Sequence, residues 1–136
     1  MFLNSLNPTE KDNFIKLAVA IIKADGIIEE SEMQILSAYA NEMQISVCNL
    51  EEQCDTVKVI QQFANESTLQ IKRIIFLELL TLAFADGNYA VEEKALVQQL
   101  ATAFKFDLTF IEHAINLTDA YVAAYTSLVN FVEKGE

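Results

Sequence analysis

The stretch that decides the fold is residues 71–93, IKRIIFLELLTLAFADGNYAVEE. Between residues 74 and 85 nearly every side chain is apolar, and Glu78 is the one charged residue there. A helix that is apolar on all sides belongs at the centre of a domain. Asp86-Gly87 ends this helix, because glycine readily adopts the left-handed conformation found after helix C-termini. The stretch therefore predicts a buried central helix, then a turn and a second helix.

An earlier stretch, residues 14–32 (FIKLAVAIIKADGIIEESE), follows the same plan. With an offset of 61 residues (86 − 25), Asp25 overlays Asp86 and Glu32 overlays Glu93. We expect an internal pseudo-two-fold repeat, with units at about residues 8–64 and 68–134. Because the first helix of each unit is too apolar to stand alone, both units should form one compact domain over residues 1–136.

The composition favours an all-α fold of about seven helices. The chain is 52% hydrophobic but has only three Gly and one Pro, so residues that favour turns are scarce. Periodicity and caps place the helices at about residues 8–24, 30–43, 47–64 with a break near 55, 68–85, 91–105, 108–116 and 119–134.

The expected helix starts rest on short polar side chains that can accept backbone N–H groups. Asn7, followed by Pro8 and Glu10, predicts a capping box for the first helix. The other expected caps are Ser67, Asp107 and Thr118.

The last expected helix carries an apolar stripe at helical spacing, which includes Tyr121, Tyr125, Leu128 and Phe131 or Val132. We expect this stripe to be part of the core, and a partner-docking face is the alternative. The hydroxyls of Tyr39, Tyr121 and Tyr125 should stay near water.

Charge and hydropathy limit the partners. The net charge is −11, which repels the phosphates of nucleic acids and anionic membrane surfaces. No apolar run reaches the roughly 20 residues that a membrane-spanning helix needs, and the N-terminus lacks the pattern of a signal peptide. Cys48 and Cys54 are expected to be reduced thiols. We therefore expect a cytoplasmic protein that does not insert into membranes.

Each Asp-Gly motif continues to a Glu seven residues after the Asp, as in the second half of a calcium-binding EF-hand loop. The first half of the loop is missing, because its first ligand positions would fall on Ile21 and Leu82, which have no oxygen ligands. Two interpretations stay open. The acidic side chains cap helix ends, or the two turns together hold a hard divalent cation.

Glu78 bears on this choice, since it lies about two helical turns before Asp86. A buried carboxylate needs a partner. We expect a Lys or Arg from another helix, and a shared metal ion is the alternative.

The segments KLAVAIIKADGIIEESEMQIL and LLTLAFADGNYAVEEKALVQQLA resemble the TerB-like family of tellurite-resistance proteins. The resemblance implies an all-α, seven-helix fold and a cytoplasmic protein with a protein partner, including a membrane-associated complex linked to metal or chemical stress. It also implies a divalent cation held by the acidic motif residues. These residues are Asp25, Glu32, Asp86 and Glu93, with Glu78 as an outside candidate.

Enzymatic activity has little support in the sequence. His113 is the only histidine, and no neighbouring residue is spaced to orient it as a catalytic base. No cofactor motif occurs. We expect a non-enzymatic interaction domain. The alternatives are a structural scaffold or co-chaperone-associated module without a ligand and, less favoured, a metal-dependent hydrolase.

Overall fold

The computed structural model describes residues 1–24, 26, 30–46, 55–84 and 91–136, with the side chains of residues 91–93 excepted. Within these ranges every regular element is helical, which confirms the all-α fold class. The elements are a short 3-10 helix, η1 (Leu3–Ser5), and the α-helices α1 (Pro8–Lys23), α2 (Glu30–Met43), α3 (Thr56–Glu66), α4 (Leu69–Ala83), α5 (Val91–Ala103) and α6 (Leu108–Lys134).

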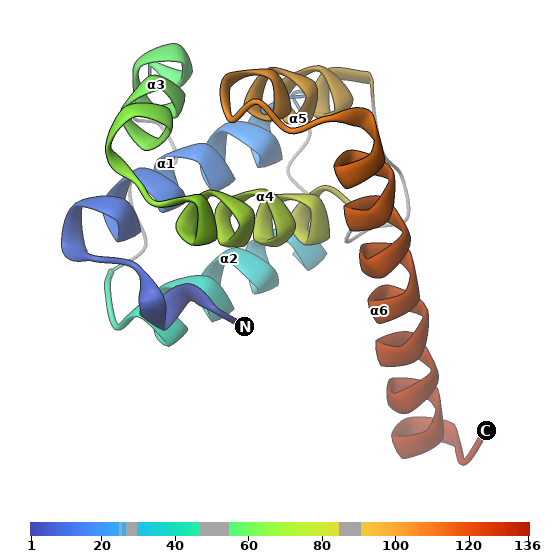
Figure 1. Cartoon of the computed structure of the whole chain (residues 1–136). Coiled ribbons are helices and arrows are strands. Elements are labelled where there is room, and N and C mark those ends of the chain that lie inside the picture. The colour runs from blue at the N-terminus through green and yellow to red at the C-terminus, as the bar shows by residue number, and fades with distance from the viewer. Residues whose placement is uncertain (25, 27–29, 47–54, 85–90) are drawn as a thin grey trace.

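Helix α4 lies in the middle of the molecule, as its apolar sequence predicts (Figure 1). It packs against α1, α5 and α6, while α1 also packs against α2 and α3. Helices α1 and α4 therefore form a central pair. The equivalence of the two sequence units stays a prediction.

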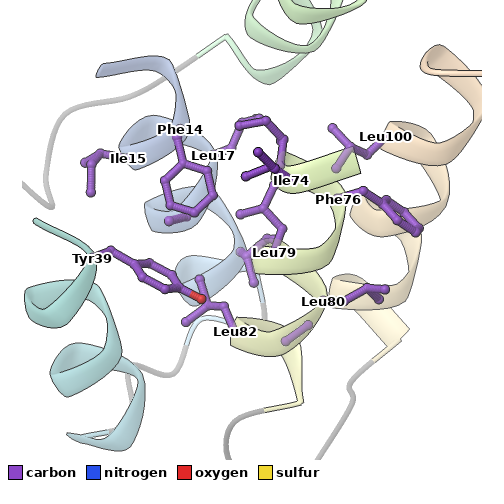
Figure 2. Close-up of a cluster of buried hydrophobic side chains, with 14 of the residues drawn as sticks. Phe14, Ile15, Leu17, Tyr39, Ile74, Phe76, Leu79, Leu80, Leu82 and Leu100 are labelled. Atoms are coloured by element: carbon purple, nitrogen blue, oxygen red, sulfur yellow. The ribbon is translucent and has the colours of Figure 1, made fainter. Parts of the chain in front are cut away.

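The core forms where α1, α2, α4 and α5 meet. Figure 2 shows Phe14 and Leu17 of α1 facing Leu79 and Leu82 of α4, with Tyr39 of α2 closing one side. The Phe14 and Tyr39 rings pack edge to face with centroids 5.2 Å apart, a favoured aromatic geometry.

Several predicted helix ends are confirmed. Asn7 and Glu10 form the full capping box at the start of α1, and Asp107 accepts the backbone N–H of Phe110 at the start of α6. Gly26 has a left-handed φ of 78° just after α1. The predicted Ser67 cap is wrong: Thr68 accepts the Ile71 N–H and begins α4.

The prediction of two helices at 108–116 and 119–134 is also wrong, because α6 is continuous from Leu108 to Lys134. Thr118 does not cap a helix. Its buried hydroxyl donates 2.8 Å to the Ala114 carbonyl one turn earlier, so the side chain is satisfied without interrupting the helix.

The first half of α6 is anchored to the body by aromatic contacts. Phe106, just before α6, packs edge to face on Phe76 of α4 at 5.2 Å and lies 4.3 Å from the Phe110 ring. Arg73 lies 5.9 Å above the Phe110 ring. The second half projects away from the other helices toward the C-terminus (Figure 1).

Candidate functional site

A groove of about 620 Å³ lies between the second half of α6 and the body of the molecule. Its body side comes from Met1, from α2 and from α4, and its outer wall comes from one face of α6. The walls are mostly apolar: Ile35 and Ala38 on α2 face Val122 and Val129 on α6. The groove has the apolar walls and few polar groups typical of binding sites.

Two carboxylates, from Glu42 and Glu78, line the groove and hold the amino terminus. The Met1 ammonium donates 2.7 Å to Glu42 and lies 3.0 Å from Glu78. The backbone N–H of Leu3 donates 2.7 Å to the second Glu42 oxygen, and that of Phe2 donates 3.2 Å to Glu78. Because η1 also buries the Leu3 side chain, the chain start is fixed by both polar and apolar contacts.

This arrangement answers the question raised by Glu78. The side chain is only 5% exposed, and its cationic partner is the amino terminus of the same chain. The expectation of a Lys or Arg is wrong, since this cation is a backbone ammonium. No sequence pattern predicts such a contact, since it joins residues that are 77 positions apart (78 − 1) and involves a backbone charge. The role of Glu78 as an outside metal candidate stays a prediction.

The carboxylates also set the electrostatics of the groove. Partial burial lowers the pKa of the Met1 amino group, but the hydrogen bonds and charges of Glu42 and Glu78 outweigh it, and the pKa is raised overall. Burial, assisted by the same two carboxylates, raises the pKa of the Tyr39 phenol well above its usual value.

Tyr39 does not keep its hydroxyl near water as predicted. It is buried, and its hydroxyl donates 2.8 Å to the backbone carbonyl of Glu78, which ties α2 to α4 behind the groove. Tyr121 and Tyr125 do lie in solvent as predicted, with their rings stacked 6.2 Å apart on α6.

The apolar stripe of the second half of α6 is exposed, so its prediction as core is wrong. The stripe comprises large side chains that are two-fifths to four-fifths accessible, Leu117, Tyr121, Tyr125, Leu128, Phe131 and Val132. The physical reason is the continuity of α6: without a turn near residue 118, the helix cannot fold back onto the body.

The predicted metal ligands are only partly visible. Asp25 and Asp86 lie outside the described residues, and so does the side chain of Glu93. Glu32 lies in the first turn of α2 and is 4% exposed. Among the described side chains, no three His, Cys, Asp or Glu residues gather in a way that could hold a metal ion.

Comparison with known protein families identifies the family of this chain. The family model described as tellurite resistance protein TerB matches residues 17–116, well over half of the chain. The chain belongs to the TerB family. No curated protein and no solved structure matches it.

The TerB match covers α2 to α5 entirely and the anchored first part of α6, and it ends at residue 116. The exposed stripe of α6, which begins at Leu117, thus lies wholly beyond the part that matches the family model. In the described part of this TerB protein, no helix combines the length and hydropathy that crossing a bilayer requires.

Proposed function

We propose that this TerB-family protein is a non-enzymatic, cytoplasmic interaction module of a tellurite- or stress-resistance type of system, and that it docks partners at the groove and at the exposed face of α6. The observation that carries the proposal is the apolar stripe on the second half of α6. Large side chains such as Leu128, 63% exposed, and Val132, 81% exposed, form one continuous face. Contiguous exposed apolar surface of this size is typical of an interaction site.

The groove supports the same function. A helix with an apolar face could lie between α6 and α2, which is a common way to recognise an amphipathic segment. The carboxylates of Glu42 and Glu78 meet one ammonium group, that of Met1, so two acidic groups face a single cation. A basic residue on a partner would be attracted to this end of the groove.

Site-specific photo-crosslinking in cells tests this function. A benzophenone amino acid at position 128 lies on the apolar face, and the matched control at position 127 lies on the polar side of the same turn. We expect discrete adducts from position 128 and few from position 127. Equal adducts from both positions, or none from position 128, would favour the scaffold without a ligand.

Metal binding at the acidic turns is a separate proposal within the same function. Its support is the pairing of Asp25 and Glu32 with Asp86 and Glu93 in the sequence. Carboxylate oxygens are the ligands that hard divalent cations such as calcium and magnesium prefer. Thermal melting in the presence of calcium, magnesium or zinc tests it.

A further inference from the structure

The exposed face of α6 has the spacing of a coiled-coil seam. Steps of three and four residues connect six apolar positions and Thr118 without a break: Ile111, Ala114, Thr118, Tyr121, Tyr125, Leu128 and Val132. Ala114 and Thr118 are buried against the body, while the last four positions face solvent. Such a 3-4 alternation is the pattern by which two helices pack side by side. The seam that anchors α6 to its own body therefore continues into solvent with the same geometry.

The charge distribution indicates which partner this seam fits. Residues 120–132 contain no Asp, Glu, Lys, Arg or His, although the chain carries a net charge of −11. Two acidic molecules repel each other over most of their surfaces. The uncharged segment is a place where two copies can meet without opposing like charges. Nothing in it selects an oppositely charged partner.

We propose that the second half of α6 pairs in antiparallel orientation with the same segment of a second copy, an inference that rests on the proposed function. An antiparallel pair in which Tyr121 meets Val132 and Tyr125 meets Leu128 of the second copy aligns both seams. This arrangement sends the two acidic bodies to opposite ends of the helix pair, whereas a parallel pair places them side by side. The contact uses the same patch on both copies, so it closes as a two-fold dimer.

The exposed area is close to what such a dimer buries. The six large side chains of the stripe together expose roughly 700 Å² per copy, taking about 200 Å² for each fully exposed residue. A stable specific interface buries about 800 Å² per partner. Within this area, the pairing brings the C-terminal turn of one copy, with Phe131, near Tyr121 at the groove of the other.

Sedimentation equilibrium of the purified full chain tests the proposal over about a hundredfold range of concentration. We expect the mass to rise from 15.3 kDa toward twice that value. Leu128→Glu places a carboxylate in the seam of each copy and should weaken association by at least about tenfold. Ser127→Glu adds the same charge one residue away, off the seam, and should leave association nearly unchanged. Circular dichroism confirms that both variants remain helical.

Spin labels distinguish the orientation, in a background where Cys48 and Cys54 are replaced by Ser. Labels at Ser127 lie close to the two-fold axis in the antiparallel pair, whereas labels at Ala120 are about 20 Å further apart along the helices, from 1.5 Å of rise per residue. A parallel pair gives similar distances at both positions and overturns the antiparallel geometry.

Three other outcomes overturn the inference. One is a mass of a single chain at every concentration, and another is equal weakening by both Glu variants. The third is a monomeric chain that sediments with neutral phosphatidylcholine vesicles, which assigns the face to a lipid surface. If the chain is monomeric but position 128 still crosslinks to other proteins, the proposed function stands and only the second-copy inference fails.

Discussion

Replacing Glu78 by Gln tests whether the central helix depends on the amino terminus. The substitution preserves side-chain volume and one carbonyl-type acceptor for the Phe2 N–H, but it removes the charge that faces the Met1 ammonium at 3.0 Å. The variant therefore isolates the ionic part of the contact. Glu42 remains as a second acceptor for the ammonium at 2.7 Å.

The size of the effect follows from the burial of the two partners. A hydrogen bond to a charged group contributes about 1.5–3 kcal/mol when it is well shielded. Here Glu78 is buried, but the Met1 side of the pair is about half exposed (48%) and keeps Glu42, so solvent screening lowers the contribution. We expect Glu78→Gln to lower the free energy of unfolding by about 1–2 kcal/mol, which is a decrease in Tm of about 3–6 °C.

Acetylation of the amino terminus provides the control, because it removes the cation and leaves the buried Glu78 carboxylate without its charge partner. In the acetylated chain, Glu78→Gln should be neutral or stabilising, since it then eliminates an uncompensated buried charge. Urea unfolding of the four combinations forms a double-mutant cycle with a coupling of about 1 kcal/mol or more. A loss of stability that is the same with and without the acetyl group would refute this account of the central helix.

Three further predictions concern pH, helix capping and metal. The raised pKa of the Met1 amino group means that its contribution to stability is fully present below the unfolded value near 8 and is lost as pH rises through the folded pKa, so urea midpoints should fall above about pH 8 in the free but not the acetylated chain. Thr68→Ala should lower the free energy of unfolding by about 1 kcal/mol, whereas Thr68→Ser, which keeps the capping oxygen, should match the wild type in the same assay. If the acidic turns bind calcium, magnesium or zinc, that ion should raise the Tm of the wild type but not of the Asp25→Asn/Asp86→Asn variant, and a flat response to all three ions would remove the metal proposal.

The features that could be predicted from the sequence are those that depend on contacts between residues close together in the chain. The Asn7 capping box joins atoms three residues apart, so its pattern is visible in the sequence. The Asp107 cap and the left-handed Gly26 are local in the same way. The burial of α4 was also predictable, because a helix without a polar face is stable only in the interior of a domain.

The errors occur where distant groups compete with a local signal. Ser67 and Thr68 are both good caps, but the Ser67 hydroxyl donates 2.5 Å to Glu10, which leaves Thr68 to cap α4. Thr118 resembles a cap in sequence, yet its burial and its bond to Ala114 keep it within α6. Both outcomes depend on tertiary contacts that no short pattern contains.

The continuity of α6 also determines where the groove lies. Had the helix ended near Thr118, the stripe with Tyr125 and Leu128 could have folded back over α2 and filled the space beside Glu42 and Glu78. Because the helix continues, Tyr121 and Tyr125 of the stripe line an open groove, while Leu128 and Val132 stay in solvent. An exposed apolar helix face of this kind promotes aggregation unless it is covered. Because the continuous α6 cannot bury this face against its own body, the covering surface has to come from another molecule. Comparing the association of the Leu128→Glu and Ser127→Glu variants tests this point. The two added charges lie one residue apart, so their effects on association differ only if the seam is covered by another molecule.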